Sequence, residues 1–148
     1  MKRFEFKLQK LLEIRQKKED QEKIELSKAS GAYQFVLNKK EKILSNIRTA
    51  LENLKNSKNN LALPDLQAYD RLVKNSENSV RMLDVEIEDK RKVMQEHIDK
   101  YSALKMERRV VETLKEKALK RYELEAGIEE QKETDEVGRD LFLRNKEK

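Results

Sequence analysis

Cysteine and tryptophan are absent from the 148-residue chain, which also holds only one proline, three glycines and one histidine. Without cysteine the chain can form neither a disulfide framework nor a thiolate metal site, and the redox state of its compartment stays open. A single histidine, His97, supports neither a two-histidine zinc motif nor a serine-histidine-acid triad. The glycines lie far apart and none precedes a lysine, which excludes a phosphate-binding P-loop. We therefore expect no enzymatic activity, no metal and no cofactor.

Long apolar runs are also lacking. No stretch approaches the roughly 18 apolar residues of a membrane span, and residues 1–12 lack the apolar core of a secretory signal. We therefore expect a cytoplasmic protein without direct membrane insertion. Charged residues make up 43% of the chain and hydrophobic residues 36%, which is typical of long helices and not of compact globular domains. The apolar residues recur at helical spacing, which argues against disorder.

The only proline, Pro64, marks the one segment where helix breakers and N-cap residues cluster, residues 59–65. This cluster predicts a turn over residues 61–65. Asp65 is the expected N-cap of the helix that follows, because its carboxylate can accept from the free amides of the next turn.

Apolar residues on both sides of this turn recur at alternating steps of three and four, the period of a coiled coil. Before the turn this stripe runs through Leu26, Ala29, Tyr33, Val36, Lys40, Ile43, Ile47, Ala50, Leu54, Ser57 and Leu61. After the turn it runs through Leu66, Tyr69, Val73, Ser76, Val80, Leu83, Ile87, Lys90, Met94, His97, Tyr101, Leu104, Arg108, Val111, Lys115, Ala118 and Tyr122. The pattern predicts an all-α fold, two long helices forming an antiparallel coiled-coil hairpin.

The predicted hairpin is a single domain over residues 1–148. Its first helix covers about residues 4–60 and its second about residues 66–136, followed by a flexible tail over residues 137–148. Folding back from the turn places Leu26 near Tyr101 and Leu8 near Ala118 or Lys117. The second helix then overhangs the first from Glu123 onward.

Two features predict a weaker stretch in the first helix. Arg15, Glu19 and Glu22 replace the apolar residues of the stripe, and Gly31 follows them. Because glycine costs a helix about 1 kcal/mol relative to alanine, we expect fraying or a bend there.

Charge and aromatic residues gather near the ends of the chain. Residues 105–122 hold seven basic and three acidic residues, whereas residues 123–136 hold seven acids and one lysine. This arrangement predicts either a partner of mixed charge or a solvated helix face. Phe4 and Phe6 can close the open end of the hairpin against Ala118 and Tyr122, anchor an interface, or do both. The net charge of +5 raises nucleic-acid binding, but acids are interleaved with the bases and argue against it.

The two ends of the chain carry the more specific motifs. The opening reads Phe4-x-Phe6-x-Leu8-Gln9-x-Leu11-Leu12-x-x-Arg15, and the tail holds Leu114-Lys115-Glu116-Lys117, Tyr122 and Glu130-Gln131-Lys132-Glu133-x-Asp135-Glu136. Together with the length of the hairpin, these motifs resemble the FliJ family of flagellar type III export proteins across the whole chain.

The resemblance implies a non-catalytic stalk whose paired helix ends enter the pore of the hexameric flagellar export ATPase and promote assembly of its ring. It also implies binding to the cytoplasmic domain of the export-gate membrane protein and to export chaperones, at the cytoplasmic face of the flagellar export apparatus, peripheral to the inner membrane. The alternatives are the equivalent stalk or escort coiled coil of a virulence secretion system and a structural coiled-coil spacer.

The same resemblance implies two sets of contact residues. The ATPase contacts match the terminal motifs and are Leu8, Leu11, Leu12, Arg15, Tyr122, Glu130, Gln131, Asp135 and Glu136. The export-gate contacts lie nearer the turn and are Ile43, Ile47, Ala50, Tyr69, Val73 and Ser76.

Overall fold

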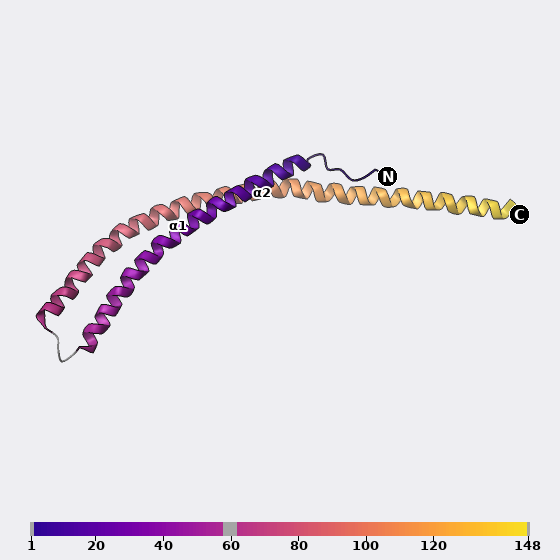
Figure 1. Ribbon diagram of the computed structural model, residues 1–148. Helices are drawn as coiled ribbons and strands as arrows, with labels where there is room; N and C mark the ends of the chain where they lie inside the picture. The colour runs from indigo at the N-terminus through magenta and orange to yellow at the C-terminus, as the bar shows by residue number, and fades with distance from the viewer. Residues whose placement is uncertain (1, 58–61, 148) are drawn as a thin grey trace. The chain divides into compact units, whose positions relative to one another are not determined.

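The computed structural model describes residues 2–57 and 62–147, which form two long helices (Figure 1). Helix α1 spans Gln9–Asn56 and helix α2 spans Leu63–Glu147, and the described ranges contain no strand. The predicted all-α fold with two long helices is confirmed. Neither helix, over these ranges, holds an apolar stretch of the length needed to cross a membrane. Residue 61, the first of the predicted turn, lies outside the described residues.

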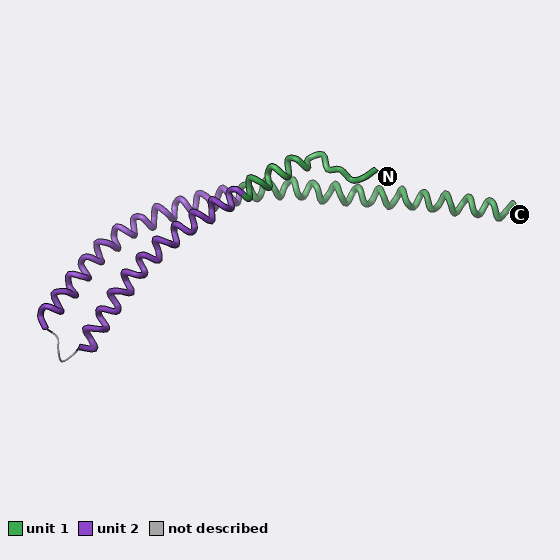
Figure 2. Tube along the Cα trace, in the orientation of Figure 1, with its two compact units in different colours: residues 1–20, 103–148 green, residues 21–102 purple. Residues whose placement is uncertain are grey.

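The chain divides into two compact units, each built from parts of both helices (Figure 2). Unit 2, Gln21–Ser102, pairs most of α1 with the first half of α2. Its two arms run antiparallel. Glu22 Oε1 lies 2.6 Å from His97 Nδ1, and further along α1 Lys40 Nζ lies 2.6 Å from Asp84 Oδ1, so the partner's residue number falls as α1 advances.

Unit 1 consists of Met1–Asp20 and Ala103–Lys148. Its two segments also run antiparallel. Arg15 donates to the carbonyl of Glu107 at 2.8 Å, and Tyr122 donates to the carbonyl of Lys2 at 2.6 Å.

The predicted stripe is the buried side of both helices. Every described stripe residue is buried or half-buried except Ser57 and Leu66, which lie beside the turn. Val36 in unit 2 and Val111 in unit 1 are the most deeply buried, at 2% exposed. A seam between only two helices encloses few side chains completely, so most stripe residues keep one exposed edge. The coiled-coil period therefore identified the packing surface correctly.

Helix α1 begins at Gln9 and not at residue 4, so the predicted start is wrong. Phe4 and Phe6 are half-buried while Glu5 and Lys7 are exposed, which is the period-two alternation of an extended chain. The extended N-terminal segment, residues 2–6, ends where the amide of Gln9 donates to the carbonyl of Phe6 at 3.1 Å.

Helix α2 begins at Leu63, so the predicted start at residue 66 is wrong, and Asp65 is not the N-cap. The carbonyl of Ala62 accepts from the amide of Asp65 at 3.0 Å, which places Asp65 inside the first turn. Proline is well tolerated there because its missing amide hydrogen has no helical partner to lose, and an aspartate near the helix N-terminus favours the helix dipole. Helix α1 ends at Asn56, short of the predicted residue 60.

Helix α2 continues to Glu147, so the predicted end at residue 136 is also wrong. Gly138 is the only helix breaker in this stretch, and Arg144 and Lys146 in the last turn favour the helix dipole. The flexibility of residues 137–147 stays a prediction. Fraying around Gly31 is not observed, since α1 is helical throughout that stretch.

Candidate protein-binding surface

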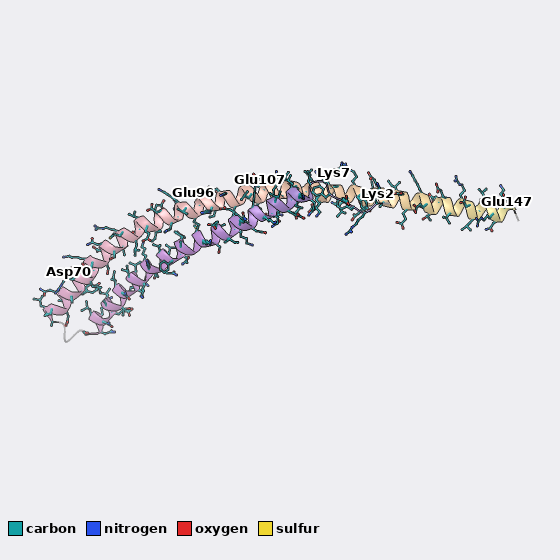
Figure 3. All side chains as sticks on the ribbon, turned by 45° about the horizontal axis from the view of Figure 1, so that its top comes forward. Lys2, Lys7, Asp70, Glu96, Glu107 and Glu147 are labelled. Atoms are coloured by element: carbon teal, nitrogen blue, oxygen red, sulfur yellow. The ribbon has the colours of Figure 1, made fainter. Side chains whose placement is uncertain are left out.

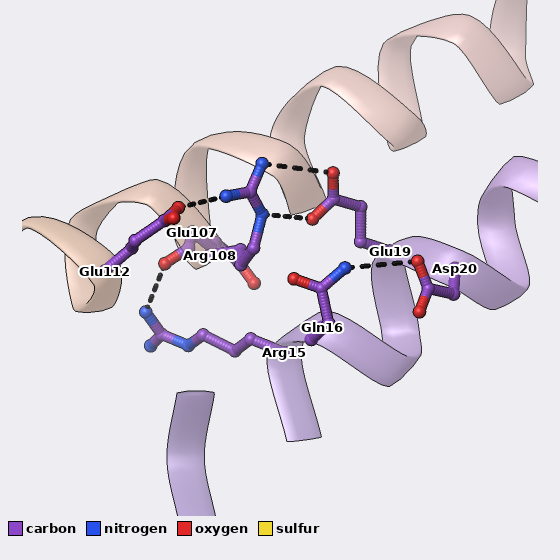
Figure 4. A network of polar contacts seen from close by, with 7 residues as sticks. All are labelled: Arg15, Gln16, Glu19, Asp20, Glu107, Arg108 and Glu112. Atoms are coloured by element: carbon purple, nitrogen blue, oxygen red, sulfur yellow. Dashed lines mark hydrogen bonds and ion pairs between the residues drawn. The ribbon is translucent and has the colours of Figure 1, made fainter. Parts of the chain in front are cut away.

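A polar layer interrupts the apolar seam of unit 1 (Figure 4). Glu19 of α1 is only 6% exposed, and its carboxylate accepts from the guanidinium of Arg108 on α2. A second bond joins Arg108 Nη2 to Glu19 Oε1 at 3.4 Å, and Arg108 also donates to Glu112 one turn away. The hydrogen bond to Glu19 is the main cause that raises the pKa of Arg108, against the opposing effect of burial. Glu19 is therefore buried as part of an ion pair.

Neighbouring contacts position this layer. Arg15 Nη1 donates to the main-chain carbonyl of Glu107 across the seam, so α1 is tied to α2 one turn away from Glu19. On α1 itself, Gln16 donates to Asp20 at 3.1 Å. Figure 4 shows Arg15 directed toward Glu107 of α2 and Arg108 directed toward Glu19 of α1. Arg15 and Glu19, two of the polar residues that interrupt the stripe in α1, thus make polar contacts across the seam.

Unit 2 has a polar layer of its own. Glu22 is 5% exposed, and its carboxylate accepts from His97 Nδ1 at 2.6 Å and lies 3.5 Å from Lys100 Nζ. Because an ionised carboxylate can only accept, Nδ1 must carry the hydrogen. The hydrogen bond with His97 lowers the pKa of Glu22 despite the opposing effect of burial, and the charge of Lys100 lowers it further. His97 is therefore a seam residue, and none of the described residues forms an acidic or histidine cluster suited to a metal.

The N-terminal segment closes the end of unit 1. The ring of Phe4 lies 5.4 Å from the ring of Tyr122, tilted by 52°. The hydroxyl of Tyr122 donates to the carbonyl of Lys2. Lys7 and Ala118 line the same surface hollow, close to the predicted contact of Leu8 with Ala118. The prediction that the opening phenylalanines close the hairpin is confirmed for Phe4.

The lone part of α2, residues 127–147, extends beyond these contacts. Every residue in it is exposed, including the large apolar side chains of Val137, Leu141 and Phe142. Figure 3 shows side chains projecting all around α2 as far as Glu147. The predicted overhang is confirmed.

The predicted ATPase contacts fall into two groups. Leu8 is 40% exposed, and Leu11, Leu12, Arg15 and Tyr122 are half-buried. These residues share the paired end of unit 1. The other four are fully exposed on the lone part of α2: Glu130, Gln131, Asp135 and Glu136. No described hydrogen bond or ion pair links the two groups.

The predicted export-gate residues all belong to the seam of unit 2. Ile43, Ile47, Ala50, Tyr69 and Val73 are half-buried, so each offers only an edge to a partner. Ser76 is only 8% exposed and has almost no accessible surface for a partner. Ala50 and Tyr69 do line one surface hollow beside the turn.

The pair between Glu19 and Arg108 was missed at the sequence level. The signal was present, because Arg108 and Glu19 occupy stripe positions on the two helices and the predicted register sets them opposite each other. Opposite charges at facing seam positions predict a cross-helix ion pair.

The fold and this surface define a class of protein. Long paired helices with a lone helical extension are typical of proteins that bind other proteins. A family model described as flagellar FliJ protein matches residues 4–147, and the chain belongs to this family of flagellar export-related proteins. Neither a curated protein nor a solved structure matches the chain.

Proposed function

We propose that the protein is the non-catalytic stalk of the flagellar export ATPase. It binds the hexameric ATPase ring through the paired end of unit 1 and the lone part of α2, and it promotes assembly and activity of the ring. It links the ring to the cytoplasmic domain of the export-gate protein and to export chaperones, at the cytoplasmic face of the inner membrane.

The lone part of α2 is the observation that carries the proposal. A helix held in the pore of a ring meets its partner on all sides, and it therefore has no face reserved for packing within its own chain. Residues 127–147 have this property, since all of them are exposed. Their membership of the matched region, residues 4–147, ties them to flagellar export.

Charge supports a specific kind of contact. Residues 123–136 carry seven acids and one lysine, all exposed. A pore lined by basic side chains would attract this segment and speed its entry, an effect that salt screens. We therefore expect ATPase binding to weaken as the salt concentration rises.

The gate contact is proposed for the turn-proximal part of unit 2. The hollow that Ala50 and Tyr69 line offers exposed edges from both arms, including Leu72, which is 38% exposed. Ile43, Ile47 and Val73 would contribute only their exposed edges, and Ser76 would act through the packing of the seam.

The test is stimulation of the cognate ATPase by the purified protein, together with pull-down of the ATPase and of the soluble gate domain. Leu8→Asp alters the exposed leucine of the paired end, and Gln131→Ala with Asp135→Lys alters the lone part of α2. Both variants should lose at least about tenfold in ATPase affinity, which corresponds to about 1.4 kcal/mol. Met82→Asp is the matched control, because Met82 is apolar and 76% exposed in unit 2.

The outcomes are distinct. Absence of stimulation at every protein ratio would contradict the proposal and leave a structural spacer as the better interpretation. Binding that the control variant loses as strongly as the terminal variants would place the contact elsewhere on the helices. Stimulation of a virulence-system ATPase in preference to the flagellar one would favour the alternative stalk.

A further inference from the structure

Helix α2 carries a second apolar stripe within unit 1, away from the seam. Met106, Val110, Leu124 and Ile128 are 71%, 59%, 68% and 51% exposed. They lie on one line along the helix with three exposed polar residues between them. We call this line the outer ridge: Met106, Val110, Thr113, Lys117, Arg121, Leu124 and Ile128. Nothing in the described part of the chain covers it.

The spacing of the residues in the outer ridge is symmetric about its central residue. Its successive steps are four, three, four, four, three and four residues, centred on Lys117. This is a repeat of 11 residues, or about 3.7 per turn, which keeps the ridge nearly straight along an α-helix. A second copy turned antiparallel about Lys117 therefore meets it position for position. Met106 faces Ile128 of the second copy, and Val110 faces its Leu124.

Charge distinguishes the antiparallel arrangement from a parallel one. Helix α2 is basic over residues 105–122 and acidic over residues 123–136. A parallel pair would set like blocks side by side, whereas an antiparallel pair brings part of each basic block against the acidic block of the other copy. We propose that the outer ridge is the interface of an antiparallel two-fold dimer of this protein. The inference goes beyond the proposed function and does not depend on it.

Charged residues on the two flanks of the outer ridge, one on each side of it along α2, would face charged residues of the second copy. A two-fold axis across antiparallel helices places each flank of one copy against the same flank of the other. On one flank Arg109 meets Glu123 of the second copy, and Glu116 meets its Lys120. On the other flank Glu107 meets Glu125, and at the axis Lys117 meets its own counterpart. All seven residues are exposed. The attractive pairs are thus partly offset by like charges.

A contact of this kind is weak. The ridge from Met106 to Ile128 is about 33 Å long, and a contact between two single helices over that length is small for a protein interface. We therefore expect a dissociation constant on the order of 10 to 100 micromolar. Replacing Lys117 with leucine adds an apolar layer at the axis and removes a like-charge pair, so Lys117→Leu should tighten the dimer by about tenfold.

Sedimentation velocity over a concentration series tests the interface. Wild-type protein should shift from monomer to dimer, and Val110→Asp should abolish the dimer. Arg109→Glu should weaken it about threefold to tenfold, and the added reversal Glu123→Arg should restore it. These two residues are 14 positions apart on one helix, about 21 Å, so restoration requires a second copy. Met82→Asp in unit 2 should change nothing, and circular dichroism checks that every variant stays helical.

The absence of cysteine allows a direct test of direction. A mixture of the single variants Met106→Cys and Ile128→Cys should oxidise mainly to a cross-linked pair of unlike chains. Self-cross-linking of Met106→Cys in preference would show a parallel pair and overturn the inference. A wild-type chain that stays monomeric at millimolar concentration, or a dimer that Val110→Asp leaves intact, would also overturn it, whatever Lys117→Leu does.

Discussion

Two parts of the same helix, α2, are stabilised in different ways. From Tyr69 to Tyr122 it presents a stripe of buried or half-buried side chains to α1 and the N-terminal segment, with Val111 almost fully enclosed. From Gly127 to Glu147 every residue is exposed, and only local contacts support the helix, such as Gln131 to Asp135 at 3.1 Å. Most helical stability in proteins comes from packing, which the described residues do not provide for this stretch.

The two parts of α2 differ in whether their apolar side chains are packed or accessible. The paired part of α2 uses its apolar residues to hold the hairpin together. The lone part leaves Val137, Leu141 and Phe142 free for a partner. Apolar side chains on α2 therefore stabilise the hairpin in the paired part and remain accessible in the lone part, where the proposed function uses them.

The largest expected effect comes from a charge in the paired part. Val111→Asp buries a carboxylate without a partner at a position that is 2% exposed, and we expect a loss of about 3 to 4 kcal/mol in the free energy of unfolding. Val137→Asp is the matched change in the lone part, where the side chain is 59% exposed. It should change stability by less than about 0.5 kcal/mol. Urea denaturation followed by circular dichroism measures both, and equal effects would contradict the comparison.

The polar layer of unit 1 gives the next largest effect. Arg108→Leu leaves the carboxylate of Glu19 buried without its partner, and we expect a loss of about 2 kcal/mol. The double variant Arg108→Leu with Glu19→Leu replaces the ion pair with apolar packing and should recover most of that loss. Thermal and urea denaturation of both variants measure the coupling. A double variant less stable than the single one would show that the pair itself stabilises the hairpin.

Acid should weaken unit 2 through Glu22. The hydrogen bond from His97 and the charge of Lys100 hold the pKa of Glu22 below its ordinary value of 4.5. A depressed pKa contributes stability that is fully present above about pH 4.5 and is lost as the pH falls through the folded-state pKa. Glu22→Gln removes this titration, so its stability should fall less than that of the wild type between neutral pH and about pH 3. Parallel slopes for the two proteins would exclude this role of Glu22.

The smallest expected effects compare two glycines with open space around them. Gly31→Ala in α1 and Gly127→Ala at the start of the lone part meet no atom within 4 Å. Each change should favour its helix by about 1 kcal/mol. For Gly31 the gain should appear in the free energy of unfolding, because α1 is packed against α2. For Gly127 it should appear as slower amide hydrogen exchange in the lone part, with little change in overall stability. A Gly127→Ala variant that raises overall stability as much as Gly31→Ala would show that the lone part is packed in solution.

Much of the fold was predictable from the sequence because the coiled-coil period repeats over many turns. A single polar residue does not hide the apolar pattern of a stripe that runs from Leu26 to Tyr122. The position of a helix end depends on a few local contacts, and the predicted first and last residues of both helices were wrong. Before the start of α1, Phe4 contacts Tyr122, a residue 118 positions away in the sequence.

The candidate surface was predictable only in part. The family motifs predicted candidate contact residues near the two ends of the chain. The acidic candidates on the lone part of α2 are exposed. Seam residues such as Ser76 could not be separated from surface residues, because a two-helix seam leaves one edge of many side chains accessible. The outer ridge was missed for a related reason. Its apolar residues are fewer than those of the seam, and charged residues interrupt it.

The motifs at the two ends of the chain carry its resemblance to the FliJ family, and a family model over residues 4–147 shows that it belongs there. Periodicity and composition alone determine that the chain forms two long helices and which sides of them pack together. These properties are encoded locally, in spacings of three and four residues. The extended N-terminal segment, the burial of Glu19 against Arg108 and the exposure of the outer ridge are decided by contacts between distant parts of the chain. Local spacing does not encode such contacts, because each depends on the register in which the two helices meet.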